Sequence, residues 1–339
     1  MNITIKDVAR ELGVSYSSIS RALNGKEGVS EATRSSIVAA AKRMGYQPNE
    51  LARGLVNRIS RTVGVIIPDI NNPFFGEIVT GIIRSAKEND YDIFLCISDW
   101  DSTNEKEYLN TLRKKRVDGI ILKPAGNENF ENYEDIKIPL MIIENHEDNK
   151  GHGSVEVDNE RGGYLAAKHL LDCGYKKLGF ILGSEDRFAC RKRLKGAEKA
   201  LRDYGLILDQ NRVIEGSFSI EGGRRTAKAL MEKNPDIDAI FGMNDLIALG
   251  VLQYLSEEQI AVPEEVGVIG FDNISYADLP QIELTTINQP KNELGKLLFE
   301  NILREIQDKD EHESIKIVIQ PELKVRKTTK IPSGERKGE

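Results

Sequence analysis

The sequence predicts an N-terminal all-α helix-turn-helix head with a hinge helix, followed by an α/β body that contains two parallel-sheet subdomains. Three observations lead to this fold class. Short amphipathic helical patterns, separated by glycines, fill the first 46 residues. From residue 62 onward, apolar strand patterns alternate with helical patterns, and the alternation restarts after residue 157. Such alternation is typical of parallel sheets that are covered by helices on both faces.

Composition and length point to an ordinary globular protein, and 339 residues allow two or three domains. No apolar run approaches the roughly 20 residues that span a bilayer, and the N-terminus lacks the pattern of a signal peptide. The three cysteines (Cys96, Cys173 and Cys190) are scattered, and the four histidines lack metal-ligand spacing. We therefore expect a cytoplasmic, nucleoid-associated protein with no metal, no cofactor and no membrane partner.

Charge is distributed unevenly along the chain. Residues 1–60 hold nine Lys and Arg against five Asp and Glu, a net charge of +4. The whole chain carries −7, so the remainder carries −11. A small basic segment on an acidic protein favours nucleic acid as the partner of that segment.

The first two predicted helices form a helix-turn-helix. Thr4 is placed to cap the helix in TIKDVAREL, Gly13 ends it, and Ser15 caps the helix in YSSISRALN. Helical spacing places these apolar residues on the inner sides of the two helices: Ile5, Val8, Ala9, Leu12, Ile19, Ala22 and Leu23. The outer side of the second helix is left with Tyr16, Ser17, Ser20 and Arg21. Small side chains beside one arginine suit close approach to phosphates and base edges, although a solvated polar helix is the plainer interpretation.

A third helix and a short fourth one complete the predicted head. VSEATRSSIVAAAKRMGY predicts a helix capped by Ser30, with Ile37, Ala40, Ala41 and Met44 on its packing face. In QPNELARGLVNRISR, Pro48 breaks the chain and a very short helix follows. A helix of that length is marginal in isolation. This segment is therefore either an ordinary linker or a hinge that folds only when DNA and a partner subunit order it.

The body is predicted element by element from its apolar periodicity. Strands are expected at 62–68, 91–97, 117–122, 138–143, 153–157, 177–182, 239–243 and 267–271. Helices are expected at 74–88, 103–115, 159–172, 189–204, 221–233 and 245–257. Neither the GxGxxG nor the GxxxxGK[ST] phosphate fingerprint is present, and there is no GxSxG nucleophile elbow, so nothing supports an enzyme.

Polar and aromatic residues follow the predicted strands, where parallel sheets place their ligand-facing loops. These candidates for a ligand site are Asn71, Phe74, Phe75, Arg187, Arg193, Phe218, Asn244, Asp272 and Gln289. Amide, carboxylate and guanidinium groups grip hydroxyls in pairs while rings cover C–H faces, which is the chemistry of a polyol site. Taken singly, each has a plainer interpretation, as a core ring, a helix cap or a surface charge.

Several segments, in order along the chain, carry a specific family resemblance: TIKDVARELGVSYSSISRALNG, VSEATRSSIVAAAKRMGYQPNELARGL, TVGVIIPDINNPFFGEIVTGI, VEVDNERGG, RLKGAEKAL, AIFGMNDLIALGVL, VGVIGFDNI and LTTINQP. With them the chain resembles the lactose-repressor/galactose-repressor (LacI/GalR) family of bacterial transcription regulators. The resemblance covers nearly the whole chain. It implies a periplasmic-binding-protein-like body with a ligand cleft between its two subdomains.

The same resemblance implies domain boundaries. Residues 1–46 would be the helix-turn-helix DNA-binding domain, 47–61 the hinge helix and linker, 62–330 the effector-binding and dimerisation domain, and 331–339 a tail. Within the body, one subdomain would comprise about 62–157 plus 286–320. The other would comprise about 158–285 plus 321–330.

The resemblance also implies roles for residues of the head. Tyr16, Ser17 and Arg21 occupy the family's base-reading positions, and Leu55 matches the leucine that each subunit wedges into the central minor-groove step. The remaining residues that it places near DNA are Thr4, Ser15, Ser20, Asn24, Ser30, Thr33, Tyr46, Asn49, Ala52 and Arg53.

In the body, Glu144 stands at the acidic position after the fourth strand, but Asn145 follows where many relatives have arginine. The effector therefore need not be one of the family's common hexoses or pentoses. The resemblance implies a repressor, homodimeric with a tetramer left open, that binds a pseudo-palindromic operator under control of a small-molecule effector, most simply a sugar. Three alternatives remain: a catabolite-control-type regulator that binds a phosphocarrier protein corepressor, a periplasmic sugar-binding protein, and an enzyme.

Overall fold

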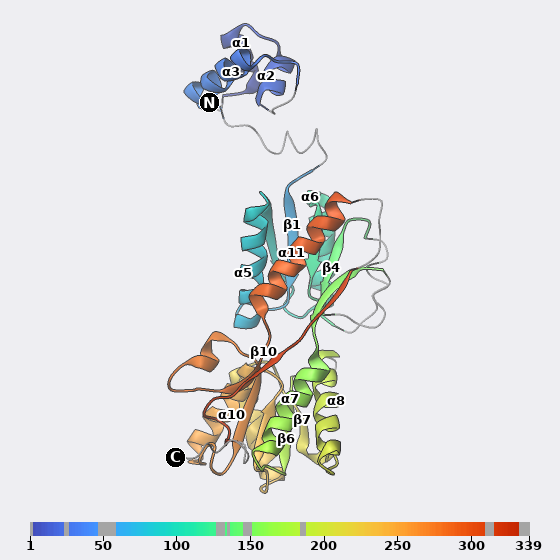
Figure 1. Cartoon of the computed structure of the whole chain (residues 1–339), viewed down its shortest axis with the longest axis vertical. Helices are drawn as coiled ribbons and strands as arrows, with labels where there is room; N and C mark the ends of the chain where they lie inside the picture. Colours follow the sequence, from blue (N-terminus) through green and yellow to red (C-terminus); the bar gives the residue numbers. More distant parts are fainter. Residues whose placement is uncertain are drawn as a thin grey trace. The chain divides into compact units, whose positions relative to one another are not determined.

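The computed structural model describes residues 3–23, 27–46, 59–126, 133, 136–144, 151–183, 188–308 and 315–331. The chain divides into two compact units, residues 1–60 and 61–339, which are the head and the body (Figure 1). Each unit is described by itself.

The described part of the head consists of the three helices that the sequence predicts: α1 (Ile5–Leu12), α2 (Tyr16–Leu23) and α3 (Glu31–Met44). Thr4 and Asp7 form a reciprocal capping box at α1, and Gly13 ends this helix with a left-handed φ of 66°. The small core between the helices is built from Val8, Ile19, Ala22, Ile37 and Ala41. The expected hinge helix lies outside the described residues.

The first lobe of the body is built on a six-stranded parallel sheet with the order β11-β5-β4-β3-β1-β2. Its strands are β1 (Thr62–Ile67), β2 (Asp92–Ile97), β3 (Gly119–Leu122), β4 (Leu140–Ile143), β5 (Gly153–Val157) and β11 (Lys316–Ile319). Its helices are α5 (Pro73–Glu88), α6 (Ser102–Lys115) and α11 (Lys291–Gln307). Alternate strand residues face opposite sides, so α5 and α11 cover one apolar face while α6 covers the other.

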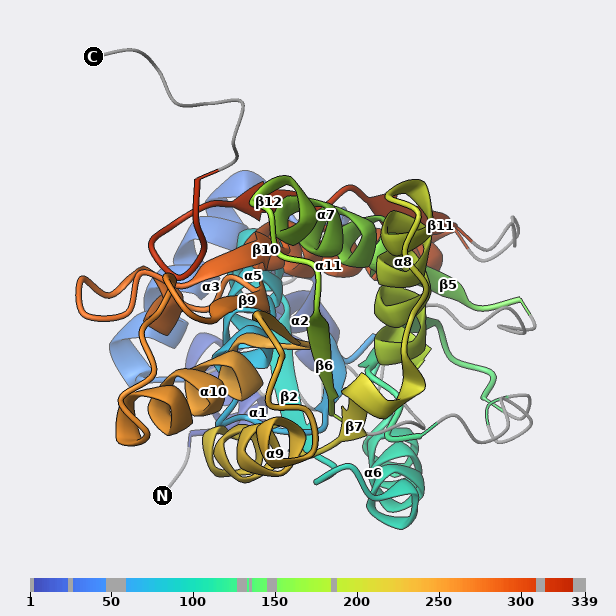
Figure 2. The same ribbon diagram turned by 90° about the horizontal axis from the view of Figure 1, so that it is seen from below.

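The second lobe has its own six-stranded sheet, with the order β12-β10-β9-β8-β6-β7. Its strands are β6 (Leu178–Leu182), β7 (Val213–Glu215), β8 (Ala239–Gly242), β9 (Gly267–Asp272), β10 (Thr285–Asn288) and β12 (Glu322–Lys324), and only β12 runs antiparallel. Its helices are α7 (Asn159–Asp172), α8 (Phe188–Asp203), α9 (Ile220–Lys233) and α10 (Asp245–Glu257). Figure 2 shows α7 and α8 on one side of this sheet and α9 and α10 on the other.

The chain passes between the two sheets three times: from β5 to α7, from β10 to α11, and from β11 to β12 (Figure 1). The two-sheet α/β architecture confirms the predicted fold class, but one boundary needs correction. The resemblance implies that about residues 286–320 belong to the first subdomain, whereas Thr285–Asn288 pairs in parallel with Ile269–Asp272 and is a strand of the second sheet. The return to the first lobe therefore begins after Asn288.

Two buried threonines, Thr328 and Thr329, hydrogen-bond the chain after β12 to the second lobe. The Thr328 carbonyl accepts the amide of Val268 on β9, and the Thr328 hydroxyl donates to the Val268 carbonyl, both at 2.7 Å. The hydroxyl of Thr329 lies 2.8 Å from Nε2 of His169 on α7 and 2.9 Å from the hydroxyl of Thr285. This contact depends on a buried histidine that stays neutral.

Acidification is expected to destabilise the body through His169. Burial lowers the pKa of His169 from 6.5 to about 4, more than the nearby Asp172 can raise it. The unfolded chain therefore takes up this proton first, so the stabilisation is present above about pH 6.5 and is lost as the pH falls toward 4. Urea unfolding should show wild type losing about 2 kcal/mol relative to His169→Gln between pH 7.5 and pH 5. Parallel pH profiles of the two proteins would contradict this assignment.

Candidate functional site

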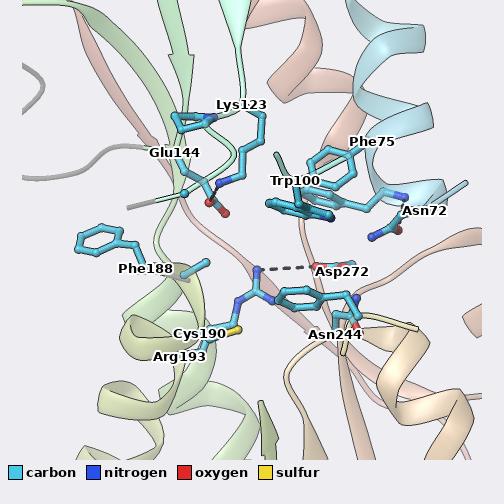
Figure 3. Close-up of a pocket in the computed structure, with 15 residues that line it drawn as sticks. Asn72, Phe75, Trp100, Lys123, Glu144, Phe188, Cys190, Arg193, Asn244 and Asp272 are labelled. Carbon is cyan, nitrogen blue, oxygen red and sulfur yellow. Dashed lines mark hydrogen bonds and ion pairs between the residues drawn. The ribbon is translucent and has the colours of Figure 1, made fainter. Parts of the chain in front are cut away.

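A pocket lies at the carboxyl ends of strands from both sheets of the body (Figure 3). Seven of the residues expected to form a ligand site line it: Phe74, Phe75, Glu144, Arg193, Phe218, Asn244 and Asp272. The pocket is also lined by residues that are not among those expected from the sequence, including Asn72, Trp100, Lys123 and Phe188. The topology thus brings together residues that are up to about two hundred positions apart in the chain.

Two of the expected ligand-site residues that the structure describes, Asn71 and Gln289, are not in the pocket wall. Asn71 is exposed, and the pocket is lined instead by the buried Asn72, which caps α5 by accepting the Phe74 amide at 3.0 Å. This capping bond turns Asn72 inward and leaves its neighbour outside. Gln289 stands behind the wall, where its Nε2 donates to Oδ1 of Asp272 at 2.6 Å. Arg187 lies outside the described residues.

The second lobe contributes an arginine–carboxylate pair. Arg193 on α8 is 5% exposed, and its guanidinium lies 3.8 Å from Oδ1 of Asp272 at the end of β9. Nε of Arg193 donates to Oδ1 of Asn159 at 2.8 Å, another nitrogen donates to the Met243 carbonyl, and the guanidinium lies 3.6 Å from the ring centroid of Phe271. These contacts fix the position of the guanidinium, and its positive charge faces the pocket.

Burial raises the pKa of Asp272, and the Arg193 charge opposes that rise. Behind it, Asp245 at the start of α10 is completely buried and accepts bonds from the Thr286 hydroxyl at 2.5 Å and the Ile274 amide at 2.8 Å. Burial raises the pKa of Asp245, and the nearby charge of Asp272 raises it further. Two carboxyl groups this close in a dry site favour a charged Asp272 beside a more readily protonated Asp245.

The first lobe contributes a second ion pair. Lys123 follows β3 and forms a short contact with Oε2 of Glu144, which follows β4. Both side chains are nearly buried, at 11% and 12% exposed. Glu144 adopts a left-handed φ of 67°, an uncommon conformation for a residue with a side chain and one that is often found at functional sites. Figure 3 shows this pair facing the Arg193–Asp272 pair across the pocket.

Aromatic rings complete the wall. Trp100, which follows β2 in the first lobe, stacks on Phe218 of the second lobe at a centroid distance of 6.0 Å and an interplanar angle of 21°. Trp100 also meets the edge of Phe75 at 5.9 Å, and Phe75 meets Phe74 at 5.1 Å. Such rings offer apolar faces beside the charged groups, so the pocket can cover the C–H face of a ring while its ion pairs bind hydroxyls.

Trp100 and Lys123 could have been found by the rule that identified the other residues. Trp100 lies shortly after a predicted strand, and Lys123 directly follows the apolar run GIIL. A lysine at the end of a buried strand has no packing reason to be there, which is itself a signal of a polar site.

Within the described part of the head, most of the candidate DNA-contacting residues are exposed. Tyr16 is 55% exposed, and Ser17 and Arg21 are exposed beside it on α2. Ser15 begins that helix, where its hydroxyl accepts the Ser18 amide at 3.1 Å. The second helix thus presents the predicted base-reading side chains on one outward surface.

The other candidates in the head divide into three groups. Thr4 and Ser30 are exposed at the starts of α1 and α3, and Thr33 lies one turn into α3, where its amide donates to the Ser30 hydroxyl at 3.3 Å. Ser20 is half-buried on α2, and Tyr46 packs against the head core. The residues outside the described part of the chain are Asn24, Asn49, Ala52, Arg53 and Leu55.

Other kinds of site find no support in the part of the chain that the structure describes. There, no group of three or more His, Cys, Asp or Glu side chains could hold a metal ion. Among the same residues, no helix is both long enough and apolar enough to cross a membrane.

Comparisons with known proteins match both units. Residues 4–49 match the family described as "Bacterial regulatory proteins, lacI family". Residues 60–327 match "Periplasmic binding proteins and sugar binding domain of LacI family". The two matches follow the division of the chain into head and body.

Full-length relatives give the same result. The HTH-type transcriptional repressor PurR of Vibrio atlanticus is 34% identical over 96% of this chain and 98% of its own length. Catabolite control protein A of Priestia megaterium is 34% identical over 97% of this chain and 100% of its own. Among solved structures, a LacI family transcriptional regulator from Enterococcus faecium with bound ribose is 30% identical, with a TM-score of 0.72 over 80% of this chain and 99% of that one.

These relatives are named as transcription regulators rather than enzymes, and the family model that matches the body is described as a sugar-binding domain. The two family matches together span nearly all of the head and body, and they confirm the resemblance seen in the sequence. This chain therefore belongs to the LacI family of DNA-binding transcription regulators.

Proposed function

We propose that this regulator represses transcription as a homodimer bound to a pseudo-palindromic operator, and that an uncharged polyhydroxyl effector, most simply a sugar, controls its operator affinity from the pocket between the lobes. The observation that carries the proposal is the pair of buried ion pairs, Lys123–Glu144 and Arg193–Asp272, facing each other between aromatic rings. A regulator with this role acts in the cytoplasm, where its DNA is.

The charge balance of the pocket favours an uncharged ligand. Among the described residues that line the pocket, each lobe supplies one cation and one anion, and each is already paired. A ligand with a phosphate or carboxylate would bring an unmatched charge into a nearly buried site, which is costly. A hydroxyl can accept from the cation and donate to the carboxylate of the same pair, so vicinal hydroxyls on two edges of a ring suit two such pairs.

Exposed apolar side chains support the homodimer. β2 is an edge strand of the first sheet, and its Phe94 and Leu95 are exposed together with Ile83 of the adjoining α5. In the second lobe, Ile220 and Leu279 are also exposed. An apolar edge strand is a liability unless another chain covers it. A two-fold dimer presents its two heads symmetrically, which explains a pseudo-palindromic operator.

Control by the effector would act through the lobes. A ligand that contacts both ion pairs binds more tightly to one arrangement of the lobes than to another, and it shifts the population toward that arrangement. The head leads into the body at the start of β1, so a changed first lobe would alter how the linker and head engage DNA. Coupling of this kind is reciprocal, because operator binding must change effector affinity by the same factor.

The test begins with an operator selected from random duplexes by the full chain. Operator affinity and thermal stability are then measured with ribose, xylose, glucose, galactose and cellobiose, and with glucuronate, glucosamine and glucose 6-phosphate as charged counterparts. We expect at least one neutral sugar to change operator affinity by about 5- to 150-fold. At 100 times its Kd it should stabilise the chain by about 2.7 kcal/mol.

Two variants sharpen this test. Lys123→Met should weaken binding of the active sugar, whereas Lys137→Met, at an exposed position, should leave it unchanged. An effect confined to the charged counterparts would refute an uncharged effector. If no small molecule alters operator affinity while the chain retains a protein from cell extract that does, a protein corepressor replaces the sugar.

A further inference from the structure

Lys291 begins α11 in the first lobe, yet its ammonium bonds to the second lobe. Nζ donates to the backbone carbonyl of Asp272 at 2.8 Å and to that of Asn273 at 2.7 Å, both at the end of β9. It also lies 3.5 Å from Oε2 of Glu77 on α5. The side chain is nearly fully buried, and its three N–H donors are matched by three oxygens from two lobes.

Local structure gives no reason for a lysine at this position. A helix N-terminus carries a partial positive charge, so a cation in the first turn is unfavourable there. Burial of an ammonium is a further cost. Lys291 therefore opposes the stability of its own helix. The contacts that offset this cost are the Glu77 carboxylate in the same lobe and the two backbone carbonyls of the other lobe.

The carbonyls that receive Lys291 belong to an unusual stretch of backbone. Asp272 has a φ of 111° and Asn273 a φ of 53°, so two consecutive residues with side chains have positive φ. Such conformations persist only where the surroundings hold them. Gln289 holds the Asp272 carboxylate at 2.6 Å, and Arg326 holds Oδ1 of Asn273 at 2.9 Å. Lys291 completes this set by holding the two carbonyls.

We propose that Lys291 is a positioning residue that ties the first lobe to the backbone of Asp272 and so keeps the lobes in the arrangement in which Trp100 stacks on Phe218. The side chain of Asp272 faces the pocket, and the backbone carbonyl of the same residue accepts the bond from Lys291. A ligand that shifts the carboxylate therefore shifts the anchor between the lobes. This deepens the proposed effector control, on which its regulatory meaning rests.

The chain contains its own probe of the lobe arrangement. Trp100 is the single tryptophan, and its stacking partner Phe218 belongs to the other lobe. Parting of the lobes would expose the indole to water, which shifts its emission to longer wavelength and increases quenching by acrylamide. The signal requires neither effector nor DNA.

The experiment compares the emission of full-length Lys291→Met with that of wild type and of Lys296→Met. Lys296 lies on the same helix but is 60% exposed and 3.6 Å from Glu300 within the lobe. We expect a red-shifted and more strongly quenched Trp100 in Lys291→Met and no change in Lys296→Met. Phe218→Ala calibrates the signal of an unstacked indole.

Lys291→Gln provides a second variant that keeps an N–H donor and should give an intermediate shift. Circular dichroism and urea unfolding establish that each variant is folded at the temperature used. If the folded Lys291 variants emit as wild type does, Lys291 is structural only and the proposal is wrong. That outcome would leave the proposed effector site standing, since no effector takes part in the measurement.

Discussion

Replacing Arg193 with methionine should destabilise the body by about 3–5 kcal/mol at neutral pH. Methionine fills much of the same volume, but it removes the bond to Asn159, the bond to the Met243 carbonyl and the charge beside Asp272. The Asp272 carboxylate would remain buried with Gln289 and Lys291 as its nearest support. Removing one partner of a buried pair costs more than the pair itself contributes, because the other charge stays behind.

The loss of stability in Arg193→Met should depend on pH, and the pKa of Asp272 determines the direction of that dependence. Burial raises the pKa of Asp272 while Arg193 lowers it, so the variant should have a higher pKa than wild type. A carboxyl whose pKa is higher in the folded chain than in the unfolded chain destabilises the folded chain as the pH rises from the unfolded pKa toward the folded pKa. The difference in unfolding free energy between variant and wild type should therefore be smaller at pH 5 than at pH 8 in urea titrations.

Two further variants distinguish the effect of the unpaired Asp272 charge from a simple loss of packing. Arg202→Met makes the same chemical change at an exposed position of the same helix and should have little effect. Arg193→Met combined with Asp272→Asn removes the stranded charge and should recover part of the stability. A double variant as unstable as the sum of the two single ones would show that the two residues do not act as a pair.

Most of the fold could be predicted because the central strands of both sheets are buried on two faces. Strands of this kind are continuous β-branched and apolar runs, as in TVGVII and LMII, and they are recognised without knowledge of their neighbours. β10 was missed because TTIN is polar, and only the tertiary structure supplies partners, such as the Thr328 hydroxyl that accepts the Thr285 amide at 2.9 Å. α11 was missed although Leu294, Leu298 and Ile302 repeat every four residues along it.

The position of the candidate site could be predicted from the sequence, but the ion pairs and hydrogen bonds between its residues could not. The rule that ligand loops follow parallel strands located Asp272 and Glu144. It could not show that Lys123 would pair with Glu144, because that contact depends on β3 and β4 being neighbours in the first sheet. Nor could it show that Lys291 would reach the other lobe, because that contact depends on how the two sheets are set against each other. The choice between Asn71 and Asn72 depends on a single capping bond, which sequence patterns do not resolve.

Replacing Arg21 with alanine should abolish most sequence-specific DNA binding while leaving non-specific binding nearly intact. Arg21 is exposed on α2, and its backbone carbonyl, not its side chain, lies near the guanidinium of Arg34. The head should therefore fold without it. A bidentate contact of arginine to guanine contributes about 1–3 kcal/mol. Loss from both heads of a dimer would weaken operator binding on the order of 30-fold to 20,000-fold.

The control for Arg21→Ala is Arg10→Ala, which removes the same charge from an 82% exposed position on α1. Affinities for the selected operator and for a random duplex are measured over a range of salt concentrations. A residue that contacts only phosphate lowers both affinities alike and reduces the salt slope, since each lost phosphate contact removes about 0.9 from it. Arg21→Ala should instead lower the operator affinity alone, because a base contact discriminates between sequences whereas charge does not. Equal losses on both duplexes would place Arg21 on the phosphate backbone and would leave Tyr16 and Ser17 as the candidate base-reading residues of α2.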